Sequence, residues 1–251
     1  MKIFILQSLR TTDKVKSGKL LSQKLEPDIP VEFKDLESDI EVFDQLDLIG
    51  NEIKSSTGKY IVHFDCHGNE DGIGIYSRAD GLSFIKWEDL RDKFRDLYLL
   101  TRQRLIISFS SCKGLNVVKL IAAFKPCPFN LITGSFRKIG FTESVNGYYL
   151  FYSEIFQGKS VEEATRTTKL MFPALDFNSF TSNALVEIGW NGYFQTQLTP
   201  EKVKERKADI IAQAISLRGS ITNEEVLFIE SRLSLQAAEE DHERFRRIFF
   251  S

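Results

Sequence analysis

The chain has 251 residues, of which 42% are hydrophobic and 27% are charged, proportions typical of a soluble globular protein. Its 33 Lys and Arg residues nearly balance 35 Asp and Glu residues, so the net charge of −2 gives no sign of nucleic-acid or anionic-membrane binding. No apolar run approaches the ~20 residues of a membrane-spanning helix, and the N-terminus lacks the features of a secretory signal. Three cysteines are too few for a disulfide scaffold and odd in number, which favours reduced thiols in the cytoplasm.

Short apolar runs alternate with amphipathic stretches along most of the chain. The apolar runs predict strands at residues 2–8, 30–33, 59–65, 104–110 and 129–134. Helical periodicity predicts helices at residues 13–25, 40–53, 87–100, 115–124, 148–156 and 161–170. Between them, residues 72–87 are typical of a hairpin that turns at Ala79-Asp80-Gly81. This alternation predicts an α/β fold, a mostly parallel sheet flanked by helices.

The last quarter of the chain has a different character. After an Asn-rich polar stretch at 176–183 and an apolar run at 184–188, helical spacing begins at Pro200, and Gly219 and Thr222 mark the end of one helix and the start of another. We expect an α/β domain at 1–199 and a helical appendage at 200–251 that has a regulatory or docking role. The appendage either packs on the domain or holds a partner or a second copy of the chain. The expected buried stripe is Val203, Ile210, Ile211, Ala214 and Leu217. His242 stands among charged residues and is expected on a solvated helix face.

Two consecutive core strands are predicted to end in reactive side chains. His67 and Gly68 follow the strand at 59–65, and Cys112 follows the strand at 104–110. Functional crevices in open α/β sheets lie beyond the carboxyl ends of the strands, so these residues should meet at one edge. A thiol becomes a good nucleophile as thiolate, a form that a neighbouring imidazole and the start of a following helix both favour.

The glycine after the histidine has a chemical use. Without a Cβ, Gly68 lets a substrate carbonyl approach its amide, and the amide of Cys112 provides a second donor for a developing oxyanion. A thiolate, a base and two donors predict acyl transfer through a thioester.

Around these residues the sequence resembles the caspase-like (clan CD) cysteine peptidases, most closely the bacterial CHAT branch. The resemblance is carried by Y-I-V-H-F-D-C-H-G at 60–68, by R-L-I-I-S-F-S-S-C-K-G at 104–114, and by the segment at 146–164. The 45 residues from His67 to Cys112 (112 − 67 = 45) fit the caspase spacing of about 50.

The resemblance implies a caspase-like fold and a cysteine endopeptidase without a cofactor. It gives His67 and Cys112 the catalytic roles and the amides of Gly68 and Cys112 the oxyanion hole. Relatives shape the pocket for the residue before the scissile bond (P1) from positions that correspond to Ser110, Arg10 and Glu143. Glu143 is the favoured determinant and would select a basic P1 residue, whereas Arg10 would select an acidic one. The partners implied are a protein or peptide substrate and an activating protein or ligand, in a bacterial defence or stress pathway.

Two other functions remain open on the sequence. A catalytically silent caspase-like module could bind partners in a signalling complex, although such a module need keep neither His67 nor Cys112. A metal-dependent hydrolase would need His63, Cys66, His67 and Cys112 as ligands, but strand alternation sends Cys66 to the face opposite His67. Cys66 and Cys127 are expected to be buried apolar residues, and His63 a packed one.

Overall fold

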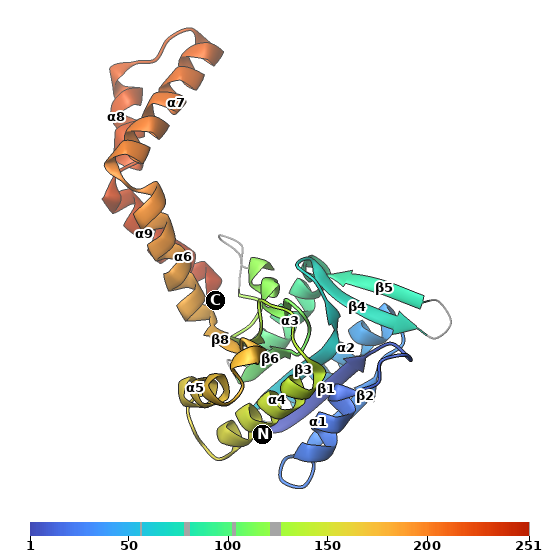
Figure 1. The fold of residues 1–251 in the computed structure, drawn as a ribbon. Coiled ribbons are helices and arrows are strands. Elements are labelled where there is room, and N and C mark those ends of the chain that lie inside the picture. The colour runs from blue at the N-terminus through green and yellow to red at the C-terminus, as the bar shows by residue number, and fades with distance from the viewer. Residues whose placement is uncertain (56, 78–80, 102–103, 121–126, 251) are drawn as a thin grey trace. The chain divides into compact units, whose positions relative to one another are not determined.

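We describe the chain from a computed structural model, which places residues 1–55, 57–77, 81–101, 104–120 and 127–250 (Figure 1). This part of the chain divides into two compact units, residues 1–120 with 127–182 and residues 183–250. The division falls after Ser182, whereas the sequence predicted a boundary between residues 199 and 200.

The first unit is built on one mixed sheet. Its main strands run in the spatial order β2-β1-β3-β6-β7-β8, and all neighbours are parallel except β8, which is antiparallel to β7. The strands are β1 (Lys2–Ser8), β2 (Val31–Asp35), β3 (Tyr60–Gly68), β6 (Leu105–Phe109), β7 (Leu131–Gly134) and β8 (Asn178–Thr181). The predicted α/β fold class is confirmed.

Helices cover both faces of this sheet (Figure 1). One face packs against α1 (Ser17–Leu25), α4 (Phe141–Phe156) and α5 (Val161–Met171). Their contact with the sheet is a single apolar cluster that includes Ile3, Ile5, Ile61, Leu21, Tyr148, Phe151 and Ala164. The opposite face packs against α2 (Asp39–Lys54) and α3 (Trp87–Thr101), where Phe94 of α3 contacts the rings of Phe64 and Phe109. Burial on both faces explains why the central strands are almost continuously apolar.

A hairpin extends from the carboxyl end of β3. It consists of β4 (Gly72–Ser77) and β5 (Gly81–Lys86), and β4 pairs with the last two residues of β3. The predicted hairpin is confirmed, although Ala79 and Asp80 of its expected turn lie outside the described residues.

Four predicted segments differ in the structure. The helix expected from Asp13 begins at Ser17, and the helix expected at 148–156 begins earlier, at Phe141. The segment expected to form a helix at 115–124 is a 3₁₀ helix at Gly114–Leu120, with its last residues outside the described part. The polar stretch at 176–183 contains β8, an edge strand, preceded by a short 3₁₀ helix at Pro173–Leu175.

The second unit consists of helices. They are α6 (Ser182–Gln197, whose first residue belongs to the first unit), α7 (Pro200–Arg218), α8 (Asn223–Arg232) and α9 (Leu235–Phe249). Gly219 ends α7 with a φ of 80°, and Thr222 caps α8, as the sequence predicted. In the described chain none of these helices, or those of the first unit, is long and apolar enough to cross a membrane.

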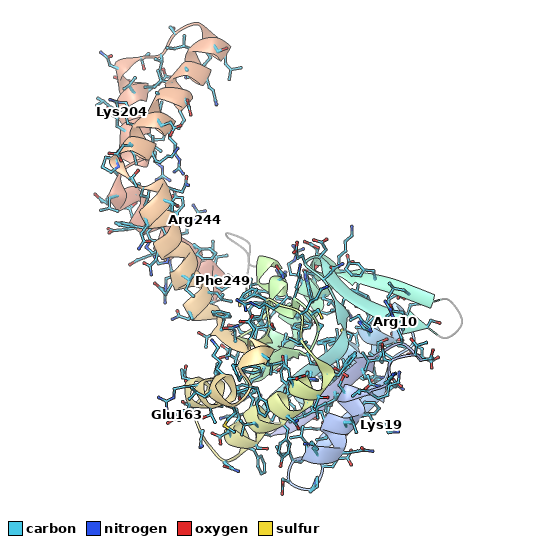
Figure 2. The ribbon with its side chains drawn as sticks, in the orientation of Figure 1. Arg10, Lys19, Glu163, Lys204, Arg244 and Phe249 are labelled. Carbon is cyan, nitrogen blue, oxygen red and sulfur yellow. The ribbon has the colours of Figure 1, made fainter. Side chains whose placement is uncertain are left out.

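Two expectations for this unit were wrong. The stripe on α7 is not buried, since no residue of α7 is, and Leu217 is 85% exposed. His242 is not on a solvated face: its ring stacks on Trp190 with centroids 4.2 Å apart, and burial lowers its pKa. Figure 2 shows the many side chains that these helices present, Lys204 and Arg244 among them.

Candidate active site

The two predicted strand ends meet through their backbones. Since β3 and β6 are adjacent and parallel, with Phe64 opposite Phe109, the residues that follow each strand lie at the same sheet edge. A Cβ built on Gly68 would lie only 2.8 Å from the carbonyl oxygen of Cys112 and 3.0 Å from Cβ of Ser111. Glycine is therefore required at this position, because any side chain would push the two strand ends apart.

His67 is held by a carboxylate from a third segment. Nε2 of His67 lies 2.9 Å from Oδ2 of Asp13, in the loop between β1 and α1, and the same oxygen accepts the Arg10 N–H at 2.7 Å. Because a carboxylate only accepts hydrogen bonds, Nε2 carries the proton and Nδ1 of the neutral ring is left as the basic nitrogen. Tyr76 and Phe141 contact the ring edge-on, with centroids 5.6 and 6.2 Å away, and fix its plane.

Cys112 lies in a tight turn directly after β6. It is a free, half-buried cysteine, and Lys113 after it has a φ of 58°, in the left-handed region. A Cβ on the next residue, Gly114, would lie 2.5 Å from Cβ of Phe109, so the turn needs a glycine there.

The amide of Cys112 is available to a ligand. The N–H of Lys113 donates to the carbonyl of Arg137 and that of Gly114 to Ser111, whereas the Cys112 N–H has no acceptor among the described residues. Such an amide, next to Gly68, is suited to the predicted role of oxyanion donor.

A buried carboxylate lies beneath these residues. Asp65 of β3 accepts hydrogen bonds from the Ser17 hydroxyl at 2.8 Å, the Gly18 N–H and the Ser110 hydroxyl at 2.6 Å. Burial raises the pKa of Asp65 above its ordinary value, although these three donors favour its ionised form. Asp65 thus ties the start of α1 to the ends of β3 and β6.

The three predicted pocket residues are not brought together. Ser110 is 8% exposed, and its hydroxyl points at Asp65. Glu143 is exposed in the first turn of α4, with its carboxylate over Gly140, where a Cβ would lie 2.3 Å from Oε2.

Arg10, the third of them, lines a cavity of about 680 Å³ together with Tyr76, Lys16, Asp35 and Glu37. Its guanidinium group lies 4.9 Å from the ring centroid of Tyr76 and donates to the Tyr76 hydroxyl. Figure 2 shows Arg10 beside the β4–β5 hairpin. Since Tyr76 also contacts His67, this cavity adjoins the site, and Glu143 is not among its lining residues.

The remaining candidates are packed in the interior. His63 is buried, with Nδ1 2.7 Å from the Tyr152 hydroxyl, and burial lowers its pKa to about 3. Cys66 is buried on the other face of the sheet, and burial raises its pKa. Within the described ranges, no group of three or more His, Cys, Asp or Glu side chains is placed to hold a metal ion.

Sequence reasoning missed Asp13, because helical periodicity was extended back over it. The available signal was the polar run Arg10-Thr11-Thr12-Asp13 directly after β1. The carboxyl end of β1 lies beside that of β3, so a loop leaving β1 reaches the same edge of the sheet.

Comparison with known proteins does not place the chain in a family. No family model matches it, and no curated protein matches it. Among solved structures it is similar to the crystal structure of Raptor from Chaetomium thermophilum, with a TM-score of 0.38 and 12% sequence identity over 79% of this chain and 22% of that one. The chain therefore spans about a fifth of that protein's resolved chain, and a likeness of this size identifies neither a family nor an activity.

Proposed function

We propose that the protein is a cysteine endopeptidase that cleaves peptide bonds through Cys112 and His67. The observation that carries the proposal is the junction of the two strand ends: Gly68 touches the backbone of Cys112, and His67 beside it has Nε2 paired with Asp13. The resemblance of residues 60–68 and 104–114 to caspase-like peptidases supports the same assignment. All three cysteines are free thiols, as expected of a thiol-dependent enzyme in a reducing cytoplasm.

The first half of the reaction forms a thioester. Nδ1 of His67 takes the thiol proton of Cys112, and the sulfur attacks the scissile carbonyl carbon. The oxyanion accepts hydrogen bonds from the amides of Gly68 and Cys112. When the tetrahedral adduct collapses, the carbon–nitrogen bond breaks and the amine leaves with the proton from His67.

The second half releases the acid. Water gives one proton to His67 as its oxygen attacks the thioester carbonyl, and the carbon–sulfur bond breaks. The Cys112 sulfur regains the proton, and the free enzyme is restored. Asp13 acts throughout as a positioning residue, because its contact with Nε2 keeps the ring in the tautomer that has a basic Nδ1.

Labelling with a thiol-reactive peptide electrophile tests the proposal. Intact-mass analysis should show one adduct, located on Cys112 and not on the buried Cys66 or Cys127. In His67→Ala the rate of labelling should fall by about 10²-fold, the contribution of a general base, whereas Cys66→Ala should be labelled as fast as the wild type. Cleavage of a peptide library by the wild type, with Cys112→Ala as the inactive control, completes the test.

Other results would favour the other functions. A folded protein whose Cys112 reacts no faster than a free thiol, and which cleaves no peptide after addition of cell extract to supply an activator, would fit a silent binding module. Stoichiometric zinc in the purified protein would fit a metal-dependent hydrolase.

A further inference from the structure

The β4–β5 hairpin has apolar side chains on both of its faces. Ile73, Ile75 and Ile85 are at most 2% exposed and face the interior. A hairpin with one buried face normally presents polar side chains on the other. Here Leu82 and Phe84 are large apolar residues on the outer face, 55% and 41% exposed.

This outer face is shared with His67. Gly74 lies opposite His67 on β3 and opposite Phe84 on β5, and Tyr76 lies opposite Leu82. Residues directly opposite one another in an antiparallel pair point to the same side of the sheet, as do residues two apart along a strand. His67, Tyr76, Leu82 and Phe84 therefore all project from one face.

Contacts agree with this assignment. A Cβ built on Gly74 would lie 2.9 Å from Cδ1 of Leu82 and 3.9 Å from Cβ of His67. Gly74 therefore lies between these two side chains and has no side chain to separate them. The Tyr76 ring contacts the imidazole edge-on. We call the three side chains Tyr76, Leu82 and Phe84 the hairpin shelf. Leu82 and Phe84 form an apolar surface exposed to solvent, and the half-buried Tyr76, whose hydroxyl is bonded by Arg10, connects this surface to the proposed catalytic base.

We propose that the hairpin shelf binds an apolar side chain of the polypeptide substrate on the amine side of the scissile bond, an inference that rests on the proposed function. In that function His67 donates its proton to the departing amine, so the amine nitrogen must lie against the imidazole. The residues attached to that nitrogen then leave the reaction centre across the face that His67 shares with the shelf. Leu, Ile, Phe or Met in the first or second position after the cleaved bond would cover Leu82 and Phe84.

A peptide library with all residues represented at each position tests this proposal. We expect the cleavage sites of the wild type to be enriched in apolar residues at one of the two positions after the bond. In the double variant Leu82→Ser, Phe84→Ser, kcat/KM for an apolar-substituted peptide should fall about tenfold, the order expected when burial of one such side chain is lost. Cleavage of the matched peptide with Ser at that position should change less than twofold.

Three controls separate the possible causes. Leu82→Met, Phe84→Leu keeps an apolar surface and should keep the preference. Leu48→Ser, Phe156→Ala removes apolar side chains of similar exposure, 58% and 46%, from α2 and α4 and should leave cleavage of both peptides unchanged. Thermal melting of each variant should stay within a few degrees of the wild type, because the substituted side chains are exposed.

The outcomes distinguish this proposal from the function it depends on. Cleavage that is lost in Cys112→Ala but shows no preference after the bond would overturn the shelf and leave the peptidase intact. The same holds if the preference exists but survives Leu82→Ser, Phe84→Ser. Absence of any cleavage that depends on Cys112 would overturn both.

Discussion

At the scale of single residues, the contact between Asp13 and His67 decides which nitrogen of the imidazole can act as a base. A carboxylate 2.9 Å from Nε2 holds the ring proton there and turns Nδ1 into the acceptor. Asp13 belongs to a loop far from His67 in the sequence, and the backbone N–H of Arg10 holds its carboxylate in position.

Replacing Asp13 by Ala should therefore reduce kcat and leave the fold intact. We expect a loss of 10²-fold or more, because the ring would lose both its tautomer and its orientation. Steady-state cleavage of a library-derived peptide measures this, with Asp28→Ala, in the exposed loop after α1, as the control for loss of a carboxylate away from the site. Unchanged kcat in Asp13→Ala would show that the ring is oriented by Tyr76 and Phe141 alone.

The buried His63, also in β3, predicts how the free energy of unfolding depends on pH. Burial lowers the pKa of His63 to about 3, whereas in the unfolded chain it is about 6.5. As the pH falls below 6.5, the unfolded chain takes up a proton that the folded chain does not, so the free energy of unfolding decreases. The loss from this group approaches about 1.4 kcal/mol per pH unit well below pH 6.5 and amounts to about 1.6 kcal/mol between pH 6.5 and pH 5.

Chemical denaturation at pH 7, 6.5, 6 and 5 can isolate the His63 contribution. The His63→Gln variant should be less stable at pH 7, since the contact with Tyr152 changes, but its stability should fall less steeply toward pH 5 than that of the wild type. Parallel curves for the two proteins would mean that His63 is charged in the folded state.

At the scale of elements, the N-terminus of α1 is capped by a side chain of β3 and not by the residue that precedes the helix. The residue before α1, Lys16, makes no side-chain cap, and the carboxylate of Asp65 accepts the Ser17 hydroxyl and the Gly18 N–H in its place. Because the loop that carries Arg10 and Asp13 leads directly into α1, this bond from β3 also fixes where the loop ends.

Removal of this cap should be costly. In Asp65→Ala the Ser17, Gly18 and Ser110 donors would be buried without their acceptor, and the free energy of unfolding should fall by about 3 kcal/mol. The matched variant Asp47→Ala removes a carboxylate from an exposed ion pair with Lys93 on α3 and should cost less than about 1 kcal/mol. Equal losses in the two variants would contradict the capping role.

The hydrogen bond from the Gly18 N–H to Asp65 also shows which kind of element can be predicted from the sequence and which cannot. β1 and α5 were predicted to within a residue, because the four apolar residues of β1 and the helical periodicity of α5 are local signals. The start of α1 was wrong because its cap is 47 residues away in sequence. β8 was missed because a polar edge strand has no apolar pattern; its partner, β7, is what makes it a strand.

The candidate site divides in the same way. His67, Gly68 and Cys112 were predicted from residues that directly follow apolar strands. The role of Asp13 beside His67 and the hydrogen bond from Ser110 to Asp65 could not be predicted, because both are contacts between residues far apart in the sequence. The resemblance to caspase-like peptidases suggested Glu143 as the main pocket residue, whereas in the structure Arg10 lines the cavity beside Tyr76.

At the scale of the whole molecule, the two units differ in how much they bury. In the first unit nearly every strand and helix contributes fully buried apolar side chains. Among the described residues from 183 onward, the buried apolar side chains are Val186, Ala237 and Phe249, and α7 and α8 contribute none. A segment of this size with so few buried side chains has little free energy with which to resist unfolding.

Calorimetry should therefore show two thermal transitions in the full chain, the lower one from residues 183–250. A chain that ends at Ser182 retains β8 and the bond from the Ser182 N–H to Asn130, and should show only the upper transition. A single transition in the full chain that is displaced by the truncation would mean that the units unfold together.

The left-handed conformation of Lys113 affects the stability of the protein and its turnover in opposite directions. A residue with a Cβ is disfavoured at a φ of 58° by about 1 kcal/mol, and the chain accepts this directly beside the proposed nucleophile. Lys113→Gly should raise the free energy of unfolding by up to about 1 kcal/mol in a denaturant titration, and it should lower turnover, because a more mobile turn holds the Cys112 amide less firmly. The turn is then a point of stability–activity trade-off, where selection for a more robust protein and selection for a faster one would choose different residues.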